Sequence, residues 1–424
     1  MRALLWIGVL AAIAAVARMA PACADDAPPA VFPVTTETDL AGYNGPSLNG
    51  AAPGSVQVNL GGRTFAALYF QNQFLKDTPG WANAPQPQFM SFFFLYPGFD
   101  YGSPSGVHFG AQAEIRATSA TQGGGIGYNT NSPVPYFHQA WSYVSSPAFG
   151  KIQFGMTSGA LVQNAVGTSD DFGTGVFFSW YNSGIIWVMA DAPDNFVTDQ
   201  KVTYTTPYFD GFHAAVSWQP TPVSLNYAND LTQNQPPGAT GLLSKDRVEL
   251  AARYDGAFGM VGVRANLGYV FSGAENAGGT KVAQSVSYGN AGVQALIAGF
   301  ELEGSVNSGR FNVAPVDNGN PDGPLPIGAR GSTAVALGAG YGAGPVKVGA
   351  VYYAVSYDEG DLGGTMGRTG RINGEGFGAG YTVGPGVVIY LDATVASIDE
   401  MNYTATAFGR QHPMSLGLGA FLTW

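Results

Sequence analysis

The chain has 424 residues, of which only 11% are charged, and it contains 61 glycines together with 21 tyrosines and 26 phenylalanines. Soluble domains carry roughly 25% charged residues, so the composition disfavours an ordinary soluble fold. Asp and Glu number 29 against 18 Lys and Arg, which argues against a nucleic-acid partner, because nucleic-acid binding depends on cations that neutralise phosphates.

The first residues have the pattern of a secretory signal peptide. Arg2 gives a positive start, an apolar run follows at 4–17, and residues 22–24 (ACA) form an A-x-A-type cleavage site. We therefore predict a signal peptide at 1–24. Its cleavage would remove Cys23, the one cysteine of the sequence, and would leave 16 basic residues against 29 acidic ones. Disulfides and cysteine metal ligands are then excluded from the mature chain.

After the signal peptide, residues 25–54 are rich in Pro, Gly, Thr and Asn and show no periodicity, which predicts a flexible leader. Beyond it no run of 18 apolar residues occurs, so helical membrane spans are not expected. The stretch 107–118 (VHFGAQAEIRAT) instead alternates apolar and polar residues, and 247–254 and 260–269 repeat the alternation. This period of two predicts strands with one apolar and one polar face.

These strands are long enough to cross a bilayer at a tilt. An apolar face toward lipid and a polar face toward a wet lumen is typical of a transmembrane barrel. The segment 338–353 resembles 378–393, and each reads as a strand, a tight turn with Gly and Pro, and a second strand. Short turns are expected at 97–105, 146–149, 208–210, 256–259, 297–298, 342–345 and 383–386.

The sequence therefore predicts an all-β fold, a transmembrane antiparallel β-barrel of about 16 strands over 55–424, with 14 or 18 strands left open. The strands are expected to start near 55, 87, 106, 136, 150, 200, 211, 246, 260, 282, 299, 331, 346, 372, 387 and 412. The last one alternates to the end of the chain at Trp424. In a closed barrel it has to pair with the first strand, which we place around 55–65.

Several stretches resemble the Gram-negative general porins, especially the alphaproteobacterial type. They are GKIQFGMTSG at 150–159, KVTYTTPYFDGFHAAVSW at 201–218, AGYTVGPGVVIYLDAT at 379–394 and MSLGLGAFLTW at 414–424. The resemblance implies a homotrimer of sixteen-stranded barrels in the outer membrane that passes small hydrophilic solutes and ions and has no enzymatic role. It also implies contact with lipid and lipopolysaccharide, and it makes Trp424 a signal for the barrel-assembly machinery.

The resemblance further implies that the long loop after the fifth strand, at about 157–199, folds inward and narrows the pore. This loop has no Lys or Arg, and its candidate constriction acids are Asp170, Asp171, Asp191 and Asp194. In the family, such acids face basic residues of the wall across the pore. The proline-glutamate-phenylalanine-glycine motif of enterobacterial porins is missing, since 168–175 reads TSDDFGTG.

The alternation places further polar residues on the lumen face, where charge clusters select solutes. The candidate wall residues are the basic Arg63, Arg116, Lys151, Arg247, Arg253 and Arg264, with Glu114 and Gln112 as other lumen residues. Purely structural roles stay open for several of these residues. Asp170 and Asp171 could lie in a solvated loop turn, and Asp191 and Asp194 could cap a turn or pair with Lys201. Arg116 could form an ion pair with Glu114 or with a neighbouring strand. The net negative charge suggests a mild preference for cations.

Two other classes of function remain open. One is a substrate-specific outer-membrane channel, which would need an aromatic track or a dense basic cluster. The other is a secreted all-β enzyme or adhesion protein, although the four histidines are isolated in sequence. No cofactor or metal is expected. The stretch 318–323 (NGNPDG) lacks the bidentate Glu of a calcium loop, so a bound calcium ion would be adventitious.

Overall fold

A computed structural model of the chain describes the strands and the short connections between them. The predicted signal peptide and the leader as far as residue 49 lie outside the described residues. Within the described part of the chain, no helix is both long and apolar enough to cross a membrane. The described residues are 50–71, 87–120, 135–166, 199–220, 244–274, 287–310, 331–358, 368–402, 407–412 and 414–424.

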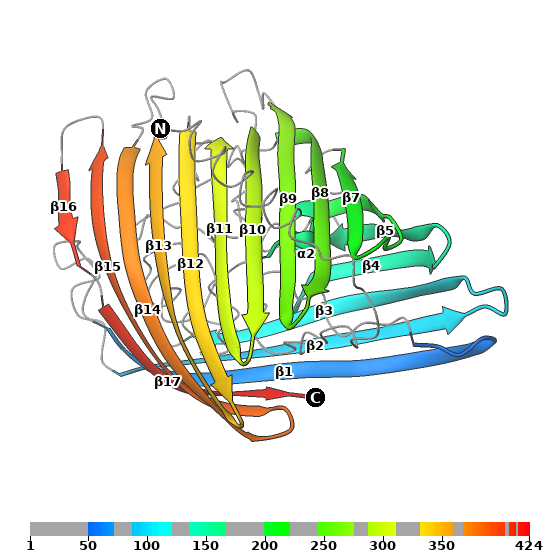
Figure 1. Cartoon of the computed structure of the whole chain (residues 1–424), viewed down its shortest axis with the longest axis horizontal. Helices are drawn as coiled ribbons and strands as arrows, with labels where there is room; N and C mark the ends of the chain where they lie inside the picture. Colours follow the sequence, from blue (N-terminus) through cyan, green and yellow to red (C-terminus); the bar gives the residue numbers. More distant parts are fainter. Residues whose placement is uncertain are drawn as a thin grey trace.

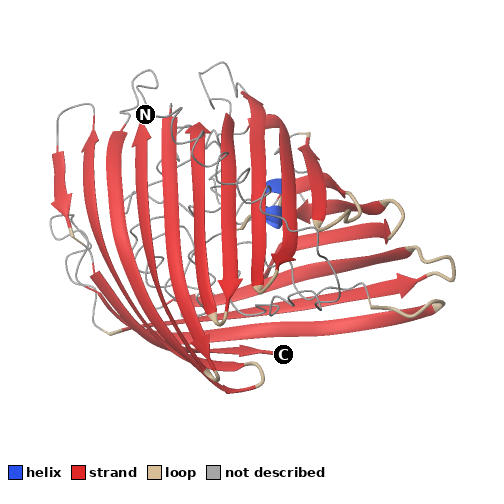
Figure 2. Cartoon of the chain, viewed as in Figure 1, coloured by secondary structure: helices blue, strands red, loops and turns tan. Residues whose placement is uncertain are grey.

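The strands form one antiparallel sheet that closes on itself (Figure 1). They are β1 (Ser55–Gln71), β2 (Gln88–Gly102), β3 (His108–Ala120), β4 (Tyr136–Ser146), β5 (Gly150–Thr157), β6 (Asp199–Thr205), β7 (Phe212–Gln219), β8 (Ser244–Phe258), β9 (Val261–Ala274), β10 (Ser287–Ile297), β11 (Phe300–Arg310), β12 (Gly331–Ala343), β13 (Val346–Asp358), β14 (Arg368–Gly384), β15 (Val387–Asn402), β16 (Ala407–Gln411) and β17 (Met414–Thr423). Both β16 and β17 pair with β15 and share one place in the ring, so the barrel has 16 strand positions. A short helix, α2 (Ala160–Asn164), accompanies the strands in Figure 2.

The predicted strand count and strand positions are confirmed, because each observed start lies close to a predicted one. The turn predicted at 97–105 is wrong at its beginning, since β2 continues to Gly102. Proline has no N–H to donate to a neighbouring strand. Accordingly, the pairing of β2 with β3 is interrupted at Pro97 and resumes at Gly98 without a change of register. The proline marks a gap in the ladder and not the end of the strand.

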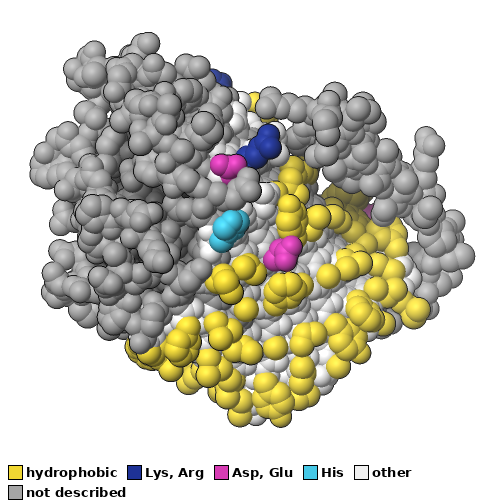
Figure 3. Space-filling view, turned by 90° about the vertical axis from the view of Figure 1, so that its left-hand side faces the viewer, with side chains coloured by type: hydrophobic (Ala, Val, Ile, Leu, Met, Phe, Trp, Pro, Cys, Tyr) yellow, Lys and Arg dark blue, Asp and Glu magenta, His cyan; other side chains and the backbone are white. Residues whose placement is uncertain are grey.

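The two faces of the wall differ in character, as β3 illustrates. Phe109 is 43% exposed, whereas Gln112 and Glu114 on the opposite parity are 4% and 2% exposed. The exposed parity is the apolar one, as expected of a surface that meets lipid. Hydrophobic side chains are accordingly frequent on the lower part of the face shown in Figure 3. The buried, polar parity faces the lumen, which confirms the two-faced strand predicted at 107–118.

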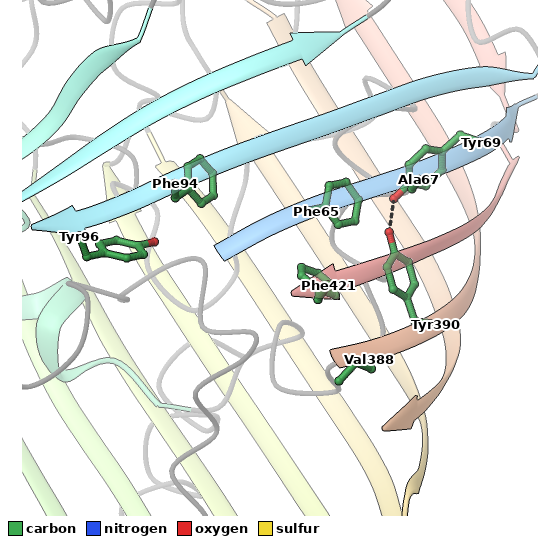
Figure 4. Close-up of a cluster of buried hydrophobic side chains, with 8 residues drawn as sticks. All are labelled: Phe65, Ala67, Tyr69, Phe94, Tyr96, Val388, Tyr390 and Phe421. Carbon is green, nitrogen blue, oxygen red and sulfur yellow. Dashed lines mark hydrogen bonds between the residues drawn. The ribbon is translucent and has the colours of Figure 1, made fainter. Parts of the chain in front are cut away.

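The lumen face is not polar throughout, contrary to what the alternation of β3, β8 and β9 suggested. Where the barrel closes, lumen-facing side chains form a mainly aromatic cluster (Figure 4). Phe65 stacks on Tyr390 with 5.8 Å between ring centroids, and it lies 5.0 Å from the ring of Phe421. The hydroxyl groups of Tyr69 and Tyr390 are 3.3 Å apart. The members of this seam cluster are Phe65, Ala67, Tyr69, Phe94, Tyr96, Val388, Tyr390 and Phe421.

The last strand closes the barrel against the first. β17 pairs with β1 from Arg63↔Thr423 to Gln71↔Ser415. Beyond this ladder, Gly62 and Trp424 exchange two backbone hydrogen bonds of 3.0 Å. The indole of Trp424 lies against Gly62, where a Cβ would come within 2.3 Å of the ring. The seam is therefore confirmed, but it uses the second half of β1, because β1 has 17 residues and β17 only 10.

We predict that deleting Trp424 lowers the yield of folded barrel. The deletion removes two backbone hydrogen bonds, each worth about 0.5–1.5 kcal/mol, and exposes the end of the seam. Heat-modifiable migration on gels measures the folded fraction after refolding into detergent. The matched control is Trp424→Phe, which keeps the backbone bonds and an aromatic ring, and it should fold as the parent does. A normal folded yield for the deletion would show that the seam does not depend on its last residue.

Candidate functional site

Two of the predicted wall cations lie in one row across the first three strands. Arg63 on β1 pairs in register with Phe94 on β2, which pairs with Arg116 on β3. Both guanidinium groups lie over the ring of Phe94, at 4.7 and 4.8 Å from its centroid. The aromatic ring therefore holds two like charges in adjacent places, because each cation is attracted to a ring face.

Arg116 also forms the ion pair that its sequence position suggested. Its Nε lies 2.6 Å from Oε1 of Glu114, and Nε2 of Gln139 donates to Oε2 of the same carboxylate at 3.1 Å. Sequence reasoning missed Gln139 and its neighbour His138, both of which are buried. The register of β3 with β4 shifts after Glu114, so one residue of β4 is left over there. A bulge of this kind breaks the alternation on which the sequence reading depended.

The loop predicted at about 157–199 enters the barrel, as its first residues show. Helix α2 follows β5 directly and lies against the lumen face of β7, β8 and β9. The amide N–H of Ala160 donates to Oγ of Ser217 at 3.0 Å, and that of Leu161 donates to Oε2 of Glu249 at 3.1 Å. The N–H of Val166 donates to Oδ1 of Asn266 at 3.0 Å.

These wall side chains replace a local helix cap. Gly159, at the N-terminus of α2, offers no side-chain cap, and the first N–H groups of a helix have no partner within it. Ser217 on β7 and Glu249 on β8 supply acceptors for the first turn. Asn266 on β9 accepts from Val166, beyond the C-terminal end of the helix. We call residues 158–166 the loop root and the wall that receives them its seat.

The carboxylate of Glu249 is the charged centre of the seat. It is 1% exposed, and its Oε1 lies 3.0 Å from Nε of Arg247 and 3.5 Å from Nζ of Lys201. A buried carboxylate is strongly destabilising unless it is paired and hydrogen-bonded. Arg247 was predicted on the lumen face, whereas Glu249 as a loop anchor was missed. Only the tertiary fold brings it to the loop root.

Close approach of the root to the wall requires glycine on both sides. An added Cβ at Gly159 would come within 1.9 Å of Oε2 of Glu249, and one at Gly292 on β10 within 1.8 Å of the carbonyl oxygen of Val166. An amide ladder supports the same region: Nδ2 of Asn266 donates to Asn290, and Nδ2 of Asn290 donates to Asn307 at 2.8 Å. No pattern in the sequence indicates this ladder.

The other predicted wall residues lie close to the short turns. Arg253 binds Asp255 through Nε and Nη2 at 2.8 and 2.9 Å, and Nε of Arg264 lies 3.3 Å from the same carboxylate. Nζ of Lys151 lies 5.9 Å from the ring centroid of Trp141. Asp255, which joins the two arginines, was not singled out from the sequence.

The four acidic residues proposed for the constriction, Asp170, Asp171, Asp191 and Asp194, lie outside the described residues. Their position opposite the basic wall stays a prediction. Within the described ranges, no group of three or more His, Cys, Asp or Glu side chains could hold a metal ion. The arrangement as a whole is a tube with an apolar exterior and charged groups along its lumen, which suits the passage of polar solutes through a membrane.

Comparisons with known proteins agree with this geometry. A family model described as Gram-negative porin matches residues 10–400, and no curated protein matches the sequence significantly. Among solved structures, the anion-selective porin from Comamonas acidovorans has a TM-score of 0.56 at 13% identity, covering 87% of this chain and all of that one. OmpF of Salmonella typhi, in complex with daunomycin, has a TM-score of 0.54 at 12% identity, and the match covers 86% of this chain and 97% of that one. The trimer form of OmpT from Vibrio cholerae has a TM-score of 0.50 at 15% identity, and the match covers 87% of this chain and 100% of that one.

We predict that Gly159→Ala and Gly292→Ala each displace the loop root from its seat and reduce single-channel conductance. The added methyl groups push the root toward the passage, and overpacking of this kind costs about 1–3 kcal/mol. Conductance in planar bilayers is the measurement. Gly384→Ala is the matched control, because nothing lies within 4 Å of a Cβ there, and it should leave conductance unchanged. Parental conductance in both seat variants would show that the root does not limit the passage.

Proposed function

The chain belongs to the Gram-negative porin family, and we propose that it works as a homotrimer with a charge-lined constriction in each channel. The chain itself forms an outer-membrane channel for the passive diffusion of small hydrophilic solutes and ions. One observation carries this function in physical terms. The barrel is closed, its exposed outer parity is apolar, and its lumen parity carries ion pairs and amides.

A constriction between the loop and the wall would select solutes by size and by field. Two observations support this part of the proposal. The loop root is held on β7, β8 and β9. Arg63 on β1 and Arg116 on β3 form a basic row on another part of the wall. A segment of 32 residues, 167–198, connects the root to β6. It is long enough to cross the lumen and return, because an extended chain spans up to about 3.3 Å per residue.

The trimer and the remaining partners are also proposed. OmpT of Vibrio cholerae, which shares the fold, is described in a trimer form. Lipid and lipopolysaccharide would contact the apolar outer face, and Trp424 would serve the barrel-assembly machinery as a recognition signal. No cofactor and no enzymatic step are part of the proposal, and any bound calcium would be adventitious.

The alternative of a substrate-specific channel would need aromatic rings presented to the solute. The seam cluster does not offer such a track, because Tyr69, Tyr390 and Phe421 are at most 3% exposed and pack on one another. Its aromatic side chains stabilise the closure of the barrel instead. The cluster therefore gives no support for a sugar-binding or similar track along the wall.

Passive conduction has a direct test. The refolded protein should produce stepwise conductance increments in planar bilayers and should make liposomes permeable to sugars, with a rate that falls steeply as the sugar grows. A size-graded series from a pentose to a trisaccharide in a liposome-swelling assay measures the cutoff. Protein left unfolded in the same detergent is the control. Folded protein that neither conducts nor admits the smallest sugar would contradict the assignment.

Ion preference has a separate test. The four candidate constriction acids, together with the excess of acid in the mature chain, should make the channel mildly cation-selective. The reversal potential under a KCl gradient measures the permeability ratio, and neutralising Asp170 and Asp171 together should lower the preference for K⁺. A clear anion preference of the parent channel would refute this charge assignment while leaving the channel function intact.

A further inference from the structure

The first strand extends beyond the strand that closes the barrel against it. β17 pairs with β1 only from Arg63 onward, and the last backbone bonds of the seam join Gly62 to Trp424. Residues 55–61 of β1 continue beyond this point and pair with β2, and Figure 1 shows β1 running on past the C-terminus. We call residues 55–61 the open edge, because none of the described strands pairs with the side of them that faces away from β2.

The open edge presents a row of backbone groups. In an antiparallel ladder, alternate residues direct both their N–H and their C=O toward the same neighbour. Gly62 exchanges two bonds with Trp424, so Leu60, Val58 and Val56 direct theirs toward the place where β17 would continue. These N–H and C=O groups therefore face a position that no described strand fills.

The side chains of the open edge show the same lack of a neighbouring strand. Val58 and Leu60 are 75% and 63% exposed, whereas Leu68, on the same face of β1 but beside β17, is 40% exposed. The opposite parity is polar, and Nε2 of Gln57 donates to Oδ1 of Asn59 at 3.0 Å. The open edge thus keeps the two-faced pattern of the wall, apolar outside and polar inside.

The beginning of β1 is fastened to the neighbouring strands. The N–H of Ala51 donates to Oδ2 of Asp100 on β2 at 3.0 Å. Asp100 is 0% exposed and also accepts a hydrogen bond of 2.6 Å from the hydroxyl of Tyr143 on β4. The pairing of β1 with β2 runs without a register shift from Ser55. The open edge is therefore preformed.

The open edge lacks the features that usually keep an unpaired strand from recruiting another. Natural edge strands carry charged residues, proline or a bulge for this purpose. The sequence SVQVNLG at 55–61 has no charged residue and no proline, and its ladder with β2 has no bulge. An edge of this composition is a template to which an extended peptide can add as a further strand.

The open edge is unfavourable in lipid and in water alike. In lipid, its backbone groups have no water to hydrogen-bond with. In water, the apolar surface of Val56, Val58 and Leu60 is hydrated, which the hydrophobic effect disfavours. An added strand with apolar residues outside and polar residues inside removes both penalties.

We propose that the open edge binds an extended segment of a partner protein as an added strand, antiparallel to β1 and in line with β17. The segment is as long as the open edge, is uncharged like it, and alternates apolar and polar residues. The added strand continues an existing interface, the seam of β1 with β17. The open edge begins opposite Gly102, beside the short connection of β2 with β3. Short turns of outer-membrane barrels are periplasmic, so the partner approaches from the periplasm.

The chain itself offers two other occupants, and both fit the open edge less well. A second copy would pair antiparallel with it only if its own β1 ran in the opposite direction, which would invert one barrel across the membrane. The leader at 25–49 contains four prolines and four acidic residues and shows no alternation. Proline cannot donate to a ladder, so this composition is unsuited to an added strand.

A labelled peptide tests the proposal on the folded mature chain. The probe is an alternating Val–Thr peptide as long as the open edge, with a lysine at each end for solubility, and fluorescence anisotropy in detergent measures its Kd. Its valines lie outside, beside Val56, Val58 and Leu60, so the N–H groups of the valines bond to β1. N-methylation of the valines should abolish binding, whereas N-methylation of the threonines, whose N–H groups point away, should preserve it.

Val58→Pro and Val58→Thr are the matched variants of the protein. Proline removes the N–H at the centre of the open edge and leaves the bonds to β2 intact, because this N–H points away from β2. Threonine keeps the N–H and the branched shape. The Kd of the peptide should rise about tenfold in Val58→Pro, as expected for the loss of a backbone bond and a steric block, and should stay within about twofold in Val58→Thr. Both variants should retain heat-modifiable migration and parental conductance.

The methylated peptides keep the proposal testable on the parent protein should Val58→Pro fail to fold. Equal binding of the two methylated peptides, or no binding of the unmethylated one, would overturn the proposal. Binding that appears only after removal of residues 25–49 would overturn it too, since the leader would then occupy the edge. Self-association that Val58→Pro abolishes would overturn it in favour of a second copy. A folded protein that binds the peptide but does not conduct would contradict the proposed function alone.

Discussion

The structure depends on pairing every backbone group of a sheet that lies in lipid. In the hydrocarbon region water is absent, and each unpaired N–H or C=O costs several kcal/mol, so an open edge is not tolerated. The chain meets this constraint by pairing its last strand with its first, and the ladder continues to the mutual bonds of Gly62 and Trp424. Closure also explains the seam cluster, because aromatic side chains on β1, β15 and β17 pack where the first and last strands meet.

The need to pair every backbone group also explains how the loop root is held. A segment that leaves the wall and enters the lumen loses its ladder partners, so its N–H groups need acceptors elsewhere. Ser217, Glu249 and Asn266 supply them from three neighbouring strands. Glycine at 159 and 292 permits the close approach. The wall is therefore both the barrier to lipid and the surface that holds the loop root inside the lumen.

Much of the barrel could be predicted from the sequence, because lipid on one side and water on the other impose a strict alternation. The prediction failed where that alternation was interrupted. The extra residue opposite Glu114 brings both His138 and Gln139 to the lumen, and Pro97 interrupts a ladder without ending its strand. On β1, apolar residues occupy both faces, so the inward direction of Phe65 could not be read from periodicity.

The lumen contacts were harder to predict than the strands for a different reason. Besides Arg247 on its own strand, Glu249 has partners on a helix 88 residues earlier and on β6, and no local pattern encodes these two contacts. Candidate cations such as Arg247 and Arg264 could be placed on the correct face, but their carboxylate partners could not be identified. Alternation determines the side of the wall on which a residue lies. Its position along the barrel axis and its neighbours depend on the register of strand pairing.

Burial divides the charges of this lumen into two kinds. At the seat, Glu249, Arg247 and Lys201 have side chains at most 5% exposed, and their interaction fixes the loop root. Near the short turns, Arg253 and Lys347 form comparable ion pairs with side chains that are 21% and 28% exposed. Water weakens these outer pairs as sources of stability, but it also puts their charges in contact with the solution. The same residue types therefore fix the loop root where they are buried and face the solution where they are exposed.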